Sequence, residues 1–202
     1  IITDTHHPQR LESEKLYRRA KMVAVIDHHR RMVDAIENAV LFYHEPSASS
    51  ASEMVAELLQ YMGEPGPGKV EAEALLCGII LDTRNFVLKA GARTFEAAAY
   101  LRRLGADTVQ VQSLFSNDIE LYRKKSALVS EATIYKEMAI AVGSGSGADI
   151  RIAASQAANE LLTIRGVKAS FTLIAMDRDV NISARSMGEV NVQLITEKLG
   201  GG

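Results

Sequence analysis

Five consecutive residues near the N-terminus combine a carboxylate, two imidazoles and two guanidinium groups: Asp27-His28-His29-Arg30-Arg31. Carboxylates and imidazoles are common ligands of divalent transition metals, and guanidinium groups bind phosphate through paired hydrogen bonds. Such a run also occurs by chance on a solvated surface loop. The run therefore indicates a metal and phosphate site only if the fold places it at one.

The residues directly before Asp27 supply that context. Val23–Ile26 is a run of four apolar residues, rich in the β-branched types that favour strands. An unbroken apolar run is typical of a parallel strand covered on both faces. Because ligands of α/β sheets bind at the carboxyl ends of such strands, we expect this strand to deliver Asp27 and the two histidines to the edge of a site.

A second acid, Asp4, has a similar context. Ile1 to Thr5 reads as the end of a strand, and Pro8 cannot continue a strand ladder. The segment 11–20 has helical spacing, so the order strand, helix, strand predicts a βαβ unit with Asp4 and Asp27 at the same sheet edge. Taken alone, Asp4 is better explained as a turn or helix cap.

A third acid, Asp82, follows a long apolar helix predicted from Lys69 to Leu81. The helix carries apolar residues at positions 72, 75, 76, 79 and 80, and this face must be buried. A carboxylate at the end of a buried element is costly unless it is paired or bound to a metal. A capping or turn role for Asp82 remains the alternative, although three acids that end three core elements are hard to explain by packing alone.

Further elements follow from local patterns. Segment 40–43 reads as a strand, and Ser50 with Glu53 has the spacing of a capping box that opens a helix. The apolar face of that helix is predicted to hold the residues Val55, Leu58, Leu59 and Met62. Thr94 to Leu104 is predicted as a helix with Thr94 as N-cap, closed by Gly105.

The character of the chain changes after Gly105. Residues 107–122 are mixed and polar and are interpreted as a connector between domains, and 127–134 continues as helix or strand. The rest predicts a small α/β domain, with strands over 138–142, 170–176 and 180–184 and helices over 150–164 and 190–199. The predicted domains are 1–106, a connector over 107–126, and 127–202.

Bulk composition excludes several classes of protein. The 202 residues are 47% hydrophobic with a formal charge of −2, which suits one large or two small domains and argues against a long nucleic acid as partner. One cysteine, Cys77, excludes a disulfide framework within the chain. We expect no membrane contact by this segment, because no apolar run reaches the length of a span. A start within a strand and an end in glycines suggest an excerpt from a longer protein.

Taken together, the motifs resemble the DHH phosphoesterase superfamily. The resemblance rests on Asp27-His28-His29-Arg30-Arg31, on Asp4-Thr5-His6 before it and on Gly78-Ile79-Ile80-Leu81-Asp82-Thr83 after it. The C-terminal part, with Ser183-Ala184-Arg185-Ser186 and Gly200-Gly201-Gly202, looks like the DHHA1 domain that follows in that superfamily. Within the superfamily, the arginine pair and Asp82-Thr83-Arg84-Asn85-Phe86 are most similar to the GdpP-type cyclic di-AMP phosphodiesterases.

The resemblance implies roles for individual residues. Asp4, His28 and Asp82 become ligands of a site for two Mn2+ ions, His29 lies beside the substrate phosphate, and Asp27 orients the imidazoles. The residues implied to face the nucleotide are Arg30, Arg185, Ser186, Gly200, Gly201 and Gly202. The family's first motif, a histidine followed by two aspartates, would lie ahead of Ile1, so this excerpt alone is expected to bind two metals poorly. His6, His7 and His44 are not interpreted as ligands. His6 and His7 lie close enough to Asp4 in the sequence to support its ligand role, but a solvated loop position is the favoured interpretation for both.

The reaction implied is hydrolysis of cyclic di-AMP to linear pApA by water that two manganese ions activate. Alternatives remain open: a hydrolase of short RNA or of pApA in the same superfamily, or a regulatory module that binds a nucleotide without catalysis. The resemblance also implies a parent protein anchored in the bacterial plasma membrane, with this part on the cytoplasmic face, and it allows a homodimer.

Overall fold

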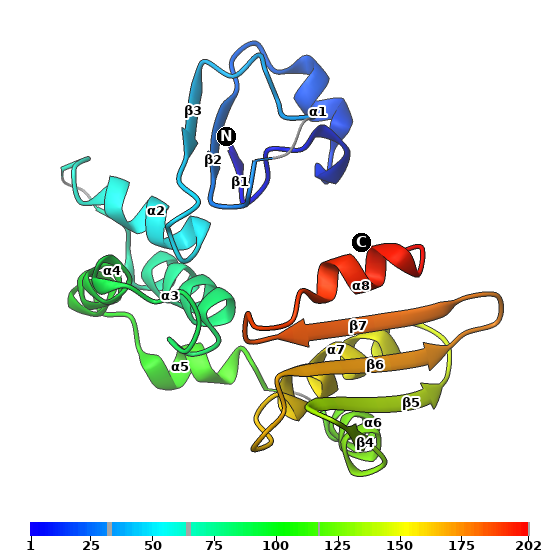
Figure 1. Cartoon of the computed structure of the whole chain (residues 1–202). Coiled ribbons are helices and arrows are strands. Elements are labelled where there is room, and N and C mark those ends of the chain that lie inside the picture. Colours follow the sequence, from blue (N-terminus) through cyan, green and yellow to red (C-terminus); the bar gives the residue numbers. More distant parts are fainter. Residues whose placement is uncertain (32–33, 64–65, 117, 202) are drawn as a thin grey trace. The chain divides into compact units, whose positions relative to one another are not determined.

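The computed structural model describes residues 1–31, 34–63, 66–116 and 118–201. The chain forms two compact units, Ile1–Ser116 and Asn117–Gly202, each drawn in Figure 1. The division falls inside the stretch predicted as a connector. Helix α5 (Thr108–Ser113) belongs to the first unit, where Val111 is buried, and α6 (Ile119–Ser130) belongs to the second.

The first unit is built on a parallel sheet of three strands in the order β1 (Ile2–Thr3), β2 (Ala24–Asp27) and β3 (Leu41–His44). A 3-10 helix, η1 (Pro8–Arg10), and helix α1 (Glu14–Arg19) connect β1 to β2. This is the predicted βαβ order. Parallel pairing brings the carboxyl ends of all three strands to one edge of the sheet.

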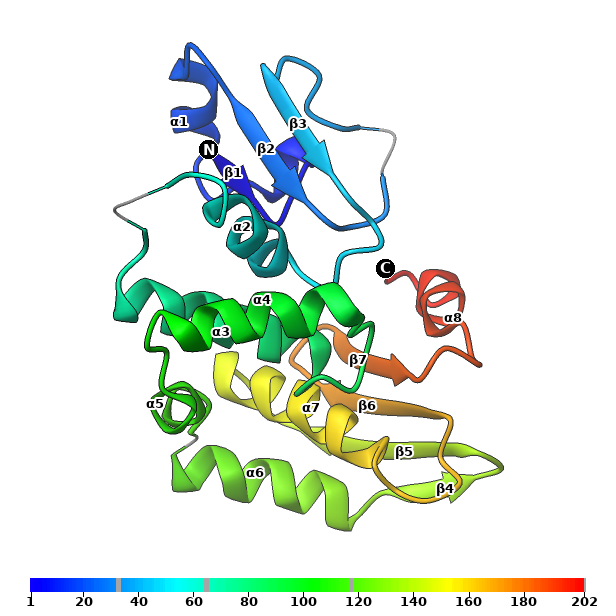
Figure 2. The same ribbon diagram turned by 90° about the vertical axis from the view of Figure 1, so that its left-hand side faces the viewer.

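Strand β2 is covered on both faces, which explains its unbroken apolar sequence. Val25 packs with Val23 and Ile36 on one side. On the other side Ile26 packs with Ala48 and with Met54 of helix α2 (Ala51–Leu59), which lies beside the sheet in Figure 2.

Helix α2 begins as predicted, with the Ser50 hydroxyl accepting the N–H of Glu53 at 3.0 Å. The predicted apolar face was only partly right: Val55 packs against the core, but Leu58 and Met62 are exposed, and Met54 and Ala56 are buried instead. The helix ends at Leu59, so Met62 lies outside it. Small and flexible side chains at 54 and 56 fit the narrow space against β2 and the neighbouring helices.

Helices α2 and α5 share a core with α3 (Lys69–Thr83) and α4 (Ala92–Arg103). The buried members are the apolar residues Ala56, Ala72, Leu76, Ile79, Ala97, Leu101, Ala106 and Val111. Helix α4 begins earlier than predicted: Gly91 is its N-cap, and Thr94 Oγ1 instead accepts the N–H of Gly91 at 3.0 Å from the third helical position. Gly105 follows the helix with a φ of +97°, a conformation that glycine adopts without strain.

The second unit is a four-stranded mixed sheet, with strands β4 (Thr133–Tyr135), β5 (Met138–Ser144), β6 (Ala169–Ala175) and β7 (Val180–Ser186) in that order. Strands β5 and β6 are parallel and the outer pairs are antiparallel. Helices α6 and α7 (Ala148–Leu161) pack on one face of the sheet, and α8 (Val192–Lys198) follows β7.

The predicted mixed α/β class is thus confirmed in both units. Segment 127–134, left open between helix and strand, is split between the end of α6 and the start of β4. Among the described residues, no helix combines the length and the apolar character that crossing a bilayer requires.

Candidate metal and phosphate site

Strand pairing places Asp4 at the end of β2. The N–H of Asp4 donates to the carbonyl of Ile26 at 3.0 Å, so the residue continues the β1–β2 ladder by one step. Asp4 has a φ of +64°, in the left-handed region that aspartate tolerates better than most residues. This turn carries the chain out of β1 and leaves the carboxylate of Asp4 beside the residues that follow β2.

His28 lies between two carboxylates. Its Nε2 is 3.2 Å from Oδ1 of Asp4 and 3.5 Å from Oδ2 of Asp82. Its Nδ1 is 3.3 Å from the carbonyl oxygen of Ala48, which can only accept a hydrogen bond. If Nδ1 donates to Ala48, the lone pair of Nε2 faces two negative groups, and a cation between them removes the repulsion. That cation is either a proton or a metal ion.

The pKa of His28 reflects this position. The hydrogen bond with Asp4 raises the pKa of the imidazole above its ordinary value of 6.5, and the charge of Asp82 acts in the same direction against the effect of burial. Without a metal the site therefore attracts a proton, as expected for a cluster arranged to hold positive charge.

Asp82 occupies an unfavourable position for an acid. It lies in the last turn of α3, where the helix dipole is negative. Burial raises the pKa of Asp82 above its ordinary value, and the charge of Asp4 adds to this effect. Both features favour a cation at the carboxylate. Asp4 and Asp82 also line a common cavity of about 310 Å3 between β1, α2 and α3.

His29 is held by Asp27. The Nδ1 of His29 lies 2.7 Å from Oδ1 of Asp27, and the backbone N–H of His29 donates to the same oxygen at 3.2 Å. Asp4, His28 and His29 each offer one ligand atom, and the three atoms lie within 4.8 Å of one another. This set of oxygen and nitrogen donors fits a divalent transition metal better than magnesium or calcium.

Asp27 itself is completely buried and has contacts on both carboxylate oxygens. Oδ2 of Asp27 is bonded to Nδ1 of His6, a histidine that is only 2% exposed. Burial acts to raise the pKa of Asp27, but the hydrogen bonds from His29 and His6 together hold it below its ordinary value. Asp27 is therefore an anion that accepts from two imidazoles.

The favoured interpretation of His6 as a solvated loop residue was wrong, because the side chain is buried against Asp27. The loop after β1 brings His6 into contact with Asp27 at the end of β2, and the spacing of residues along the chain does not predict such a contact. The signal available was its place two residues after Asp4, in the Asp4-Thr5-His6 motif. Of the other two histidines, His44 is near the site, with Nε2 2.6 Å from the carbonyl oxygen of His29, and His7 caps η1 by accepting the N–H of Gln9.

The side chains of Arg30 and Arg31, the two arginines after the histidines, have different surroundings. The side chain of Arg30 is exposed directly after His29. The guanidinium of Arg31 stacks over the ring of Phe42, with 5.7 Å from its central carbon to the ring centroid. Arg30 thus keeps a free approach to solvent next to the cluster, whereas Arg31 packs against β3.

The residues expected to face a nucleotide in the second unit are grouped around β7. Arg185, Gly200 and Gly201 line one cavity of about 470 Å3 beside α8, and Gly202 lies outside the described residues. Asn181, Gln193 and Thr196 are further polar residues at that cavity. Ser186 uses its hydroxyl oxygen to accept from the N–H groups of Gly188 and Val190, which shapes the turn after β7.

The guanidinium of Arg185 is held by neutral partners. Its Nε donates to Oδ1 of Asn159 at 3.0 Å, and Nη2 donates to the hydroxyl of Ser155 at 2.7 Å, both on α7. Burial lowers the pKa of Arg185 below its usual value. A half-buried cation that contacts an amide and a hydroxyl retains its full charge for an anionic ligand.

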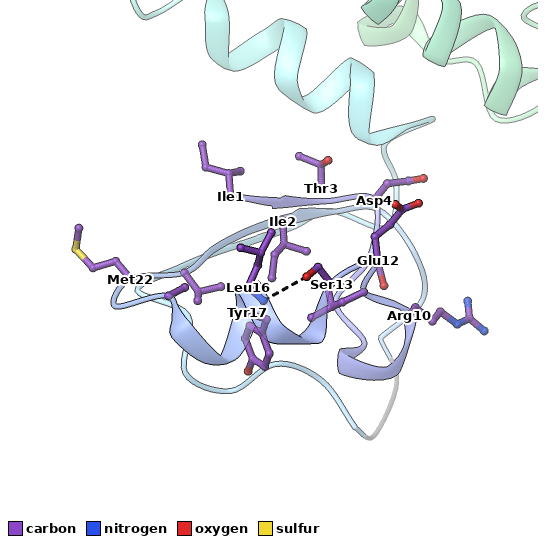
Figure 3. A pocket seen from close by; sticks show the side chains of 14 residues that line it. Ile1, Ile2, Thr3, Asp4, Arg10, Glu12, Ser13, Leu16, Tyr17 and Met22 are labelled. Carbon is purple, nitrogen blue, oxygen red and sulfur yellow. Dashed lines mark hydrogen bonds between the residues drawn. The ribbon is translucent and has the colours of Figure 1, made fainter.

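A second hollow in the first unit, of about 600 Å3, lies along β1 and α1. Figure 3 shows its lining, in which Ile1, Ile2, Leu16 and Met22 are apolar and Asp4 stands at one end. The lining contains none of the imidazoles of the cluster, so this hollow has little of the chemistry described above.

Comparison with known proteins agrees with the geometry. Residues 1–79 match the model of the DHH family, N-terminal domain. The whole chain is 46% identical to the cyclic-di-AMP phosphodiesterase PdeA of Listeria monocytogenes and 48% identical to the cyclic-di-AMP phosphodiesterase GdpP of Geobacillus thermodenitrificans. In both cases the chain spans 31% of the length of the relative.

A solved structure shows the same fold at low sequence identity. An exopolyphosphatase-related protein from Bacteroides fragilis superposes with a TM-score of 0.79 at 21% identity, over 92% of this chain and 57% of that one. Residues 1–79 thus match the N-terminal domain of the DHH family, and the chain as a whole is similar to a part of PdeA and of GdpP.

Proposed function

We propose that this chain is the catalytic part of a metal-dependent phosphodiesterase that hydrolyses cyclic di-AMP to linear pApA. The observation that supports the proposal most directly is the convergence of Asp4 and Asp82 on Nε2 of His28. Three donor atoms from separate elements meet there, and their charges favour a cation. The names of the relatives at 46% and 48% identity support the choice of substrate.

In this proposal Asp4, His28 and Asp82 hold the metal, and the preferred occupant is a pair of Mn2+ ions. Bound divalent ions supply an activated water and neutralise charge on the phosphoryl oxygens. The chain's own residues then orient the substrate. His29, fixed at Nδ1 by Asp27, presents its other nitrogen for the phosphate, and the exposed Arg30 beside it adds a guanidinium.

The groove beside β7 is the proposed nucleotide site of the second unit. Arg185 supplies a cation of retained charge, and the backbone of Gly200 and Gly201 allows close approach of a ligand, because neither residue carries a side chain. In this proposal Arg185 and Gly201 therefore contact the nucleotide and take no part in breaking the phosphodiester bond. Ser186 supports this groove by fixing the turn that follows Arg185.

Turnover by the full-length protein tests the proposal. Protein stripped with a chelator should hydrolyse cyclic di-AMP only after manganese is added, and the product should be pApA. Absence of turnover with saturating manganese would contradict the enzymatic function and favour a regulatory module that only binds the nucleotide. Faster turnover of pApA or of short RNA on the same preparation would instead favour the other hydrolase of the superfamily.

The location proposed for this part of the protein is the cytoplasmic face of the bacterial plasma membrane, with the anchor outside the chain described here. Fractionation of cells that express the full-length protein tests the location, because the protein should sediment with membranes and resist protease added outside the cell. Whether the protein is a homodimer is tested by its mass in solution.

A further inference from the structure

His6 is buried although it lies in a loop. Its ring packs edge-on against Phe42 and His44, with centroid separations of 6.2 Å and 5.2 Å. Its backbone carbonyl accepts the N–H of Ile36 at 2.9 Å, which ties the loop after β1 to the segment before β3. Histidine is only intermediate in its tendency to be buried, and a buried imidazole needs partners for its polar atoms.

The partner of His6 is the carboxylate that holds His29. Asp27 has one oxygen bonded to His6 and the other bonded to His29, so the carboxylate is fixed at both ends. A buried carboxylate is stable only when each oxygen has a donor. His6 therefore does more than fill space, because the orientation of Asp27 depends on it.

We propose that His6 is a positioning residue for the reaction: through Asp27 it fixes the tautomer and the orientation of His29. This inference rests on the proposed function. When Nδ1 of His29 donates to Asp27, the lone pair stays on Nε2, the nitrogen available to a metal or a phosphate. Without His6 the carboxylate of Asp27 loses one of its two anchors and can rotate about its Cβ–Cγ bond, which loosens the bond to His29.

Packing alone is the competing explanation, and side-chain chemistry separates the two. His6→Leu and His6→Phe fill the space without a donor. In His6→Asn the amide nitrogen is bonded to Cγ, the atom that carries Nδ1 in histidine, so the asparagine can still donate to Asp27. If His6 only fills space, the two apolar variants should keep the wild-type kcat, or at least have a higher kcat than the asparagine variant.

Steady-state kinetics of the full-length protein with manganese and cyclic di-AMP give the first measurement. We expect H6L and H6F to lower kcat by about 10- to 100-fold with little change in KM, the range that loss of a group supporting a metal ligand produces. H6N should stay within about threefold of the wild type. The control is H7L, at the neighbouring histidine whose ring accepts the N–H of Gln9, and its kcat should be unchanged.

A second measurement uses the metal-free protein and needs no activity. Long-range 1H–15N correlation spectra of the imidazoles should show His29 as a single tautomer protonated at Nδ1 in the wild type and in H6N, and as a mixture of tautomers in H6L. Because this readout is independent of turnover, an inactive wild type would contradict the proposed function and leave the positioning role to be decided by the spectra.

The proposal is overturned if a folded donor-free variant keeps both the wild-type kcat and the single tautomer of His29. If neither H6L nor H6F folds, H6N decides the matter. Folded H6N with a kcat reduced by tenfold or more, or with mixed tautomers of His29, contradicts the proposal, and H6N close to the wild type supports it.

Discussion

Nε2 of His28 lies 3.5 Å from Oδ2 of Asp82, although one residue follows a strand and the other lies in the last turn of a helix. The contact joins the sheet of the first unit to its helical layer. It also explains why an acid is kept at the negative end of α3, where it is costly unless a cation is near. The first prediction follows from this cost.

Asp82→Asn should lower the activity of the protein without lowering its stability. We expect hydrolysis to fall by about 100-fold or more, a larger loss than the roughly 10- to 100-fold that follows removal of a group supporting a ligand. The free energy of unfolding without metal should stay equal or rise by about 0.3–1 kcal/mol, because a negative charge leaves the C-terminal end of a helix. Kinetics and urea unfolding in the presence of chelator measure the two effects.

Glu71→Gln is the matched control, since Glu71 is an exposed acid in the first turn of the same helix. There the charge favours the dipole, so E71Q should keep full activity and lose a few tenths of a kcal/mol. A folded D82N variant with unchanged manganese-dependent turnover would rule out Asp82 as a ligand.

The raised pKa of His28 predicts a pH dependence of the metal-free protein. Relative to an ordinary value of 6.5, the folded pKa is higher because of the hydrogen bond with Asp4. The stabilisation by protonated His28 is therefore fully present below about pH 6.5 and is lost as the pH rises through the folded pKa. Urea unfolding from pH 5.5 to 9 should show this loss in the wild type.

His28→Asn removes the titrating group, so the difference between its unfolding free energy and that of the wild type should shrink as the pH rises. Parallel curves for the two proteins would contradict the assignment. The same protonation competes with metal, so manganese affinity of the wild type should decrease on acidification through that pKa.

A charge placed beside Arg185 should weaken substrate binding. Asn159→Asp converts the neutral partner of Arg185 Nε into a carboxylate, which neutralises the cation proposed to bind the nucleotide. We expect KM for cyclic di-AMP to rise by roughly tenfold, about 1.4 kcal/mol, with a smaller effect on kcat. Asn159→Ala, which leaves the charge of Arg185 intact, should have a weaker effect.

Asn38→Asp is the control for this experiment, because it adds the same charge at an exposed residue that accepts a hydrogen bond from Tyr17. Its KM should match the wild type. If N159D and N38D behave alike, Arg185 has no part in binding the substrate.

The segment after Asp82 is conformationally strained. Arg84, Asn85 and Phe86 follow one another with φ values of +48°, +59° and +64°. A left-handed conformation costs an ordinary residue roughly 1–2 kcal/mol, and asparagine less. Asn85→Val should therefore lower the free energy of unfolding by about 1–2 kcal/mol, whereas Asn85→Gly should stay within about 1 kcal/mol of the wild type.

Chemical unfolding of the two Asn85 variants measures this difference. Equal stability of N85V and N85G would mean that residue 85 is not held in the left-handed region. Since the strained residues come directly after Asp82 and Thr83, we interpret the turn as a support that ends α3 at a fixed point next to the cluster.

Local patterns predicted much of the framework. The β-branched run before Asp27, the turn at Pro8 and the helical spacing of 69–81 each correspond to an observed element, because each reports burial or backbone preference over a short stretch. The exact position of a helix cap is harder to predict from local patterns. Thr94 has the side chain of an N-cap but lies at the third helical position, because a hydroxyl can accept from the backbone at either place.

Patterns along the chain predict that an acid ends or directly follows each of three elements, because a strand or helix with an apolar face dictates where polar residues begin. Which side chains meet depends on how distant segments of the chain pack together. His6 reaches Asp27, and Asp82 reaches His28, through the return of a loop and the packing of a helix on a sheet. Such contacts depend on distances between residues far apart in the chain, and periodicity along the chain contains no such distances.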